Sequence, residues 1–117
     1  MDDRGSLAPK RFPKIGQVAG VELAAASAGI RHKGRKDVIL VKLARKTTVA
    51  GVFTKSRMVS APVIWSKERL YLGYARALLD NSGNANAFTG VAGTYAVKKV
   101  GEALAKEIGC RSAEIFM

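Results

Sequence analysis

Residues 81–90 read NSGNANAFTG and stand between an apolar run at residues 77–79 and the longest helix-like segment of the chain. Asn, Ser and Gly tolerate left-handed backbone angles and carry short hydrogen-bonding groups, so this run between a strand and a helix predicts a specific loop. Rigid scaffolds often position functional groups on such loops. An Asn- and Gly-rich loop is more often structural, however, and at this point both interpretations stay open.

The segments that flank this loop predict an alternation of strands and helices. Apolar residues recur at intervals of three and four within residues 91–108, which predicts a helix that Gly109 closes. Residues 60–70, which begin Ser-Ala-Pro, predict a shorter helix. Residues 74–79 and 113–117 predict strands. This order indicates an α/β domain of layered sheets and helices.

Two further strands are expected before the loop. The first half of residues 18–28 predicts a strand, in which Gly20 marks a bulge or a close backbone approach. The β-rich runs at residues 38–44 and 47–54 predict an antiparallel hairpin that turns at residues 45–46. Both runs are apolar at most positions, so we expect the sheet to be covered on both faces.

The N-terminal residues predict a tethered segment followed by one domain. Pro9 and Pro13 oppose a helix and favour extended backbone over residues 1–17. The domain then covers residues 18–117. Because the chain stops within the predicted apolar strand at residues 113–117, we expect this domain to be incomplete at its C-terminal end.

The chain of 117 residues is strongly basic, with 20 Lys and Arg residues against nine Asp and Glu residues. Its net charge of +11 is typical of a protein that binds nucleic acid, an anionic membrane or an acidic partner. The densest patch, RHKGRK at residues 31–36, has no interleaved aromatic residue, and the sequence carries no nucleic-acid-binding motif. A stand-alone basic binding module is the alternative reading. A longer protein with an acidic remainder would explain the charge equally well.

The remaining composition indicates a globular protein of a reducing compartment. Hydrophobic residues make up 48% of the chain, yet no apolar run approaches the roughly 20 residues that span a bilayer. The first residues carry no apolar signal region. The single cysteine, Cys110, excludes an internal disulfide. We therefore expect a cytoplasmic protein with no role at a membrane.

Residue types that usually carry catalysis are scarce. His32, the single histidine, lies in the basic patch, where a general base is not expected. Cys110 follows a helix end whose dipole disfavours a thiolate, so we expect it to be a small packing residue. One His and one Cys cannot build a zinc site. Asp80 closes a strand beside the loop, and its expected role is that of a cap or turn acceptor.

Residues 76–90, RALLDNSGNANAFTG, closely resemble the signature loop of the ornithine acetyltransferase (glutamate N-acetyltransferase, ArgJ) family. Other segments agree with the N-terminal half of that family in the same order: LAPKRFP at 7–13, VAGV at 18–21, AGI at 28–30, GRKD at 34–37, AGVFT at 50–54 and SAPV at 60–63. The resemblance covers nearly the whole chain. Asp80 departs from it, since an apolar residue is expected at that position.

The resemblance implies the layered α/β fold of the ArgJ and DmpA type, of which this chain is the N-terminal part of the α chain. It also implies an enzyme of arginine biosynthesis that transfers the acetyl group of N-acetylornithine to glutamate. Some members use acetyl-CoA as well, and no cofactor is expected. Members cut themselves between Ala and Thr, and the new N-terminal Thr of the β chain is the nucleophile.

A Thr-Gly pair of the α chain supplies the oxyanion hole in this family, and by the resemblance it would follow Met117. No catalytic residue is therefore expected in this chain, and Thr89-Gly90 is not that pair. The expected partners are the remainder of the α chain and the β chain, in an α2β2 assembly without nucleic acid. The predicted supporting residues of the active site are Asn81, Ser82, Asn84 and Asn86.

Overall fold

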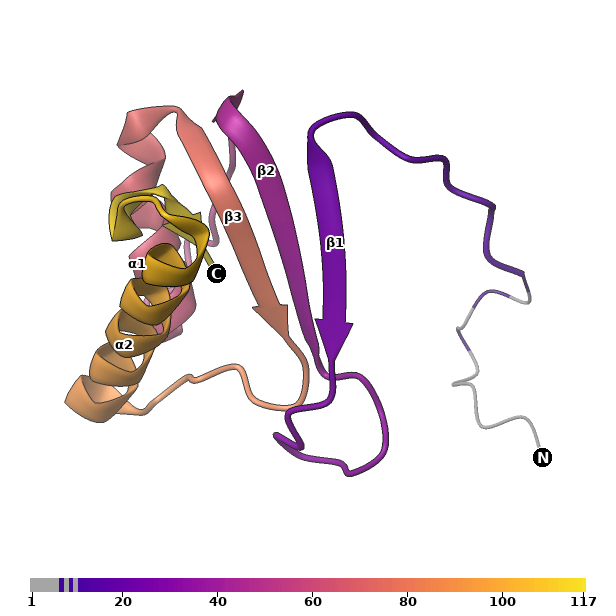
Figure 1. Ribbon diagram of the computed structural model, residues 1–117. Coiled ribbons are helices and arrows are strands. Elements are labelled where there is room, and N and C mark those ends of the chain that lie inside the picture. Colours follow the sequence, from indigo (N-terminus) through magenta and orange to yellow (C-terminus); the bar gives the residue numbers. More distant parts are fainter. Residues whose placement is uncertain (1–6, 8, 10) are drawn as a thin grey trace.

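The computed structural model describes residues 7, 9 and 11–117, which form a four-stranded sheet and two α-helices (Figure 1). This mixture confirms the predicted α/β class. In chain order the elements are β1 (Val21–Ala26), β2 (Val38–Thr48), α1 (Ala61–Arg69), the short 3-10 helix η1 (Leu70–Leu72), β3 (Tyr74–Asn81), α2 (Gly90–Ile108), the 3-10 helix η2 (Ser112–Glu114) and β4 (Ile115–Phe116).

The strands lie in the order β1-β2-β3-β4. The first two pairs are antiparallel, whereas β3 and β4 are parallel and are connected through α2. A parallel pair needs such a crossover because the chain must return to the same end of the sheet. Figure 1 shows both helices beside β3, while β1 lies at the opposite edge with no helix next to it.

The predicted hairpin of residues 38–44 and 47–54 is wrong. Residues 38–48 form a single long strand, β2, which pairs with β1 on one side and with β3 on the other. Residues 49–59 contain no helix or strand. The expected turn at residues 45–46 is instead an irregularity within β2, where Lys46 has a φ of +60°. Local β propensity did not reveal the partner, because β3 lies more than 25 residues further along the chain.

The expectation that the sheet is covered on both faces is also wrong for this chain. One face of β3 and β4 packs against α2, where Ala77, Ala105 and Ile115 form the buried core. The opposite face carries Leu23, Ile39 and Leu78, whose exposed fractions are 73%, 47% and 41%. Although β1 and β2 are rich in apolar residues, the residues that the structure describes do not cover both faces of these strands.

Helix α1 covers the outer edge of β4. The Trp65 indole Nε1 donates to the carbonyl of Ile115 at 2.8 Å. The Ser66 hydroxyl donates to the carbonyl of Met117 at 2.7 Å and accepts from its N–H at 3.0 Å. These bonds satisfy backbone groups that an edge strand would otherwise leave unpaired.

The other predicted helices and strands agree with the structure apart from their bounds. Ser60 stands at the N-cap of α1 without a side-chain capping bond, and Gly73 and Gly109 close the helices with φ values of +69° and +73°. β1 begins at Val21, and a Cβ on Gly20 would lie 3.1 Å from the Ala44 Cβ, which confirms a close approach.

The division of the chain into a segment 1–17 and a domain 18–117 stays a prediction. Residues 1–6, 8 and 10 of that segment lie outside the described residues, and residues 11–17 contain no helix or strand. None of the helices that the structure describes is long and apolar enough to cross a membrane.

We expect Gly101→Ala to destabilise the protein. A Cβ at this position of α2 would lie 2.4 Å from Cζ2 of the buried Trp65 ring and 3.1 Å from Cε of Met117. Overpacking costs about 1–3 kcal/mol, while the better helix propensity of Ala returns about 1 kcal/mol. Urea denaturation should therefore show a net loss of about 1 kcal/mol, and at most about 2 kcal/mol, in the free energy of unfolding. Ala103→Ser, at an exposed position of α2, is the control and should leave it nearly unchanged.

Candidate functional site

The amide-rich loop connects the end of β3 to the start of α2, and its own side chains fold it. The Asn81 Nδ2 donates to the carbonyl of Asn84 at 2.9 Å, and the backbone N–H of Asn86 donates to the Asn84 Oδ1 at 2.8 Å. Asn side chains favour such local bonds to the backbone, which replace the regular bonds of a strand or helix. The loop is therefore a defined structure.

Asn86 ties this loop to both helices. Its Oδ1 accepts from the Thr89 hydroxyl at 2.7 Å, its Nδ2 donates to the Gly93 carbonyl at 3.0 Å, and its own carbonyl accepts from the Ala61 N–H at 3.2 Å. Asn86 has a φ of +49°, a left-handed conformation that Asn adopts more readily than most residues. A Cβ on Gly93 would lie 1.8 Å from the Thr89 Oγ1, so this packing requires glycine.

The loop also contacts the basic turn that connects β1 and β2. The Ser82 N–H donates to the carbonyl of Asp37 at 2.9 Å. Gly83 has a φ of +101°, and a Cβ there would lie 2.8 Å from the Arg31 Cβ. In Figure 1 the connection after β1 and the connection after β3 lie at the same end of the sheet. Two segments 50 residues apart in sequence therefore support each other.

Asp37 is the carboxylate that organises this end of the sheet. It is 5% exposed, and its two oxygens accept from the N–H groups of Ala28 and Ile30 at 2.6 Å and 2.7 Å. These bonds to backbone N–H groups, foremost that of Ala28, hold the pKa of the Asp37 carboxyl below its ordinary value of 3.8. No local pattern of residues indicates this role, because the two donor N–H groups lie nine and seven residues before Asp37, with no motif spacing.

The expected acceptor role of Asp80 is not what the structure shows. Asp80 lies within β3 opposite Ile39, it is exposed, and its side chain has no hydrogen bond among the described residues. His32 is exposed in the basic turn, as expected. Cys110 packs against the core, and burial raises the pKa of its thiol, with Glu114 adding to the effect. A raised thiol pKa agrees with a packing role.

A cavity of about 290 Å³ lies beside the loop. Three of the four predicted supporting residues line it (Asn81, Asn84 and Asn86), whereas Ser82 does not. Met117 also lines it, because the parallel strands β3 and β4 leave the sheet at the same end. The only titratable lining residue is Asp80, and the described lining contains no His, Lys or Cys. These residues can position backbone and bind by hydrogen bonds, but they supply no nucleophile with a base.

Sequence reasoning missed Thr89 and Gly93 as parts of this arrangement. Both follow Asn86 by a short interval, at three and seven residues, so the Asn–Thr spacing was the available signal. Among the residues that the structure describes, no group of three His, Cys, Asp or Glu side chains could hold a metal ion.

A sequence profile of the ArgJ family matches residues 22–117. The chain is 52% identical to the arginine biosynthesis bifunctional protein ArgJ of Bradyrhizobium diazoefficiens over 111 residues, which cover 95% of this chain and 27% of that protein. It is 51% identical to the ArgJ protein of Nitrobacter winogradskyi over 95% of this chain and 28% of that protein. The chain thus spans about a quarter of the length of these relatives.

Two solved structures share the fold. The crystal structure of ornithine acetyltransferase from Mycobacterium tuberculosis, complexed with ornithine, has a TM-score of 0.72 and 37% identity over 83% of this chain and 53% of that chain. The ArgJ structure from Bacillus halodurans has a TM-score of 0.73 and 25% identity over 84% of this chain and 51% of that chain.

We expect Asp37→Asn to destabilise the turn between β1 and β2 at neutral pH, because a neutral amide accepts hydrogen bonds more weakly than a carboxylate. Hydrogen exchange at the N–H groups of Ala28 and Ile30 should accelerate by on the order of tenfold. The folded-state pKa is depressed, so the contribution of Asp37 is complete above about pH 3.8 and is lost as the pH falls through the folded-state value.

The stability difference between wild type and Asp37→Asn should accordingly shrink below pH 3.8 in thermal melts. Asp80→Asn removes the same charge from an exposed carboxylate without a hydrogen bond in the described structure, and it serves as the control. A pH-independent deficit of Asp37→Asn would contradict the assignment.

We expect Asn86→Ala to cost about 2 kcal/mol of stability, because it removes two side-chain hydrogen bonds and leaves a non-glycine residue without a stabilising amide at positive φ. Asn86→Gly removes the same bonds but accepts the backbone angle, so it should cost less. Ser82→Ala is the control, since the Ser82 side chain makes no hydrogen bond to described residues. Equal unfolding midpoints for all three variants in urea would show that Asn86 does not hold the loop.

Proposed function

This chain belongs to the ArgJ family, and on that basis we propose that it is the N-terminal part of the α chain of a glutamate N-acetyltransferase. The proposed enzyme transfers the acetyl group of N-acetylornithine to glutamate. The observation that carries the proposal is the similarity over nearly the whole chain to relatives named for arginine biosynthesis. The amide loop, which is the family's identifying stretch by resemblance, folds as a braced structure beside a cavity and agrees with this assignment.

The proposed chemistry is a two-step acetyl transfer. A Thr hydroxyl at the start of the β chain attacks the acetyl carbonyl of N-acetylornithine, and ornithine leaves with a proton. The amine of glutamate then attacks the acetyl ester and regenerates the hydroxyl. Each step passes through a tetrahedral oxyanion, which needs hydrogen-bond donors at fixed positions. By resemblance these donors belong to a Thr-Gly pair that follows Met117.

The contribution of this chain is then one of positioning. Trp65 binds the backbone of β4 at Ile115, and Ser66 binds that of Met117, the residue after β4, so they fix the direction in which that strand leaves the sheet. The loop residues Asn81, Asn84 and Asn86 line the cavity that Met117 also borders. A shift of about 1 Å in such supporting backbone can cost on the order of a hundredfold in rate.

The proposal includes the partners and donors that the family resemblance implies. The chain would act with the remainder of the α chain and with a β chain in an α2β2 assembly. It would need no cofactor and would operate in the cytoplasm, with acetyl-CoA as a second acetyl donor if the enzyme is bifunctional like its named relatives. These relatives give no support to a stand-alone basic binding module.

The complete gene product that contains this chain should transfer acetyl groups from N-acetylornithine to glutamate. Its intact mass should show two polypeptides, the second of which begins with Thr. Residues 1–117 produced alone should transfer none, because no nucleophile of the proposed mechanism lies among them.

Replacing the Thr that begins the second polypeptide by Ala in the gene provides the matched control. This variant should remain a single uncut polypeptide without transferase activity. A complete wild-type product that is uncut and inactive with both N-acetylornithine and acetyl-CoA would sink the proposal.

A further inference from the structure

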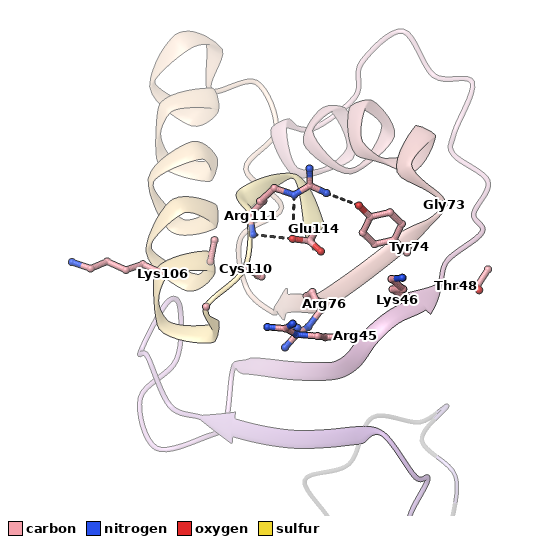
Figure 2. Close-up of a pocket in the computed structure, with 12 residues that line it drawn as sticks. Arg45, Lys46, Thr48, Gly73, Tyr74, Arg76, Lys106, Cys110, Arg111 and Glu114 are labelled. Carbon is pink, nitrogen blue, oxygen red and sulfur yellow. Dashed lines mark hydrogen bonds and ion pairs between the residues drawn. The ribbon is translucent and has the colours of Figure 1, made fainter.

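A second cavity, of about 770 Å³, lies at the start of β3 and the C-terminal end of α2 (Figure 2). It stands at the opposite end of β3 from the amide loop, so it does not belong to the site described above. Five basic side chains and one acidic side chain line it: Arg45, Lys46, Arg76, Lys106, Arg111 and Glu114. Its volume is in the range of small-molecule sites, which is about 300–1,000 Å³.

A bulge in β2 gathers three of these cations. In the β2–β3 register Lys42 pairs with Ala77 and Thr47 pairs with Ala75, so four residues of β2 face the single residue Arg76. Arg45 and Lys46 lie in this bulge. Figure 2 shows the Arg45 and Arg76 side chains reaching the same part of the cavity. Bulges commonly redirect side chains in this way next to functional sites.

The backbone of the bulge is strained. Lys46 has a φ of +60°, which costs a non-glycine residue conformational energy. The Thr47 hydroxyl donates to the Ala44 carbonyl at 2.8 Å and helps to hold this geometry. The strained residue is therefore a lysine whose side chain lines the cavity, where a glycine would be the unstrained choice.

The cations of the bulge lack counter-charges among the described residues. No acidic side chain there lies within 4.0 Å of Arg45, Lys46 or Arg76. Glu114 is already engaged, since its Oε2 accepts from the backbone N–H of Arg111 at 2.9 Å and lies 3.5 Å from the Arg111 Nε. The Arg111 guanidinium also donates a hydrogen bond from its Nη2 to the Tyr74 hydroxyl.

Arg76 gives the strongest indication that the cavity binds an anion. Its Nε is buried and has no hydrogen-bond partner in the described structure. A buried N–H of a charged group is costly unless an acceptor binds it. The carbonyl end of α2 lies nearby and its dipole opposes an anion, but it cannot offset three clustered cations. Lys106 extends away from the cavity in Figure 2.

We propose that this cavity binds the oxyanion group, carboxylate or phosphate, of a small organic molecule. The Arg76 guanidinium donates to the oxyanion, and Arg45 and Lys46 neutralise its charge. Guanidinium groups bind such planar or tetrahedral oxyanions through short, charge-assisted hydrogen bonds. The site is separate from acetyl transfer and does not depend on that function being correct.

The test is isothermal titration of the complete protein with citrate and with inorganic phosphate, at fixed ionic strength in chloride buffer. We expect saturable binding of at least one probe with one site per chain, and the tighter probe identifies the oxyanion. Arg76→Lys keeps the charge but removes the guanidinium donors, and it should weaken binding by on the order of tenfold.

Lys46→Gly separates binding from folding. It removes a cation of the site but relieves the positive φ, so the melting temperature should not fall while the affinity drops severalfold. Lys55→Gly makes the same exchange at an exposed position outside the cavity and should leave the affinity within twofold of wild type. The proposal is overturned if neither citrate nor phosphate binds, which would be the result if a segment of the complete protein fills the cavity. It is also overturned if the Lys46→Gly and Lys55→Gly variants bind the probe with equal affinity.

Discussion

The structure depends most on the hydrogen bonds that α1 makes to the edge of β4. β4 has only two residues, and a strand of that length has too few ladder bonds to hold itself in place. The Trp65 indole and the Ser66 hydroxyl supply the missing partners, and Arg69 secures the helix by lying 3.1 Å from the Trp65 ring centroid. Gly101 lets the indole approach α2, so one buried ring joins both helices to the sheet.

This constraint fixes which end of the sheet can carry a site. With β4 parallel to β3, the last residues of the chain and the amide loop emerge together, and they share a cavity. The basic turn between β1 and β2 braces the same end through Asp37, whose bonds to backbone N–H groups and to Ser82 need no second charged partner. Support for the proposed active site therefore comes from three segments of sequence, each held by backbone hydrogen bonds.

The basic charge of the chain divides into parts with different structural settings. The patch at residues 31–36 lies in an exposed turn beside the amide loop. A second group forms only after folding, when the bulge in β2 brings Arg45 and Lys46 opposite Arg76. Net charge alone is compatible with nucleic acid, membrane or an acidic partner, whereas a cavity with a buried, unpartnered guanidinium N–H favours a specific small anion.

The sequence by itself determined the elements whose signals are local. The spacing of apolar residues and Gly109 predicted α2, Ser-Ala-Pro predicted the start of α1, and the amide-rich stretch predicted a defined loop and, by resemblance, the family. Only the tertiary structure decided the pairing of β2 with β3, the open face of the sheet, and the hydrogen bonds of Trp65 and Ser66 to the backbone of Ile115 and Met117. Strand partners and buried hydrogen bonds join residues far apart in sequence, so no local pattern of residue types can specify them.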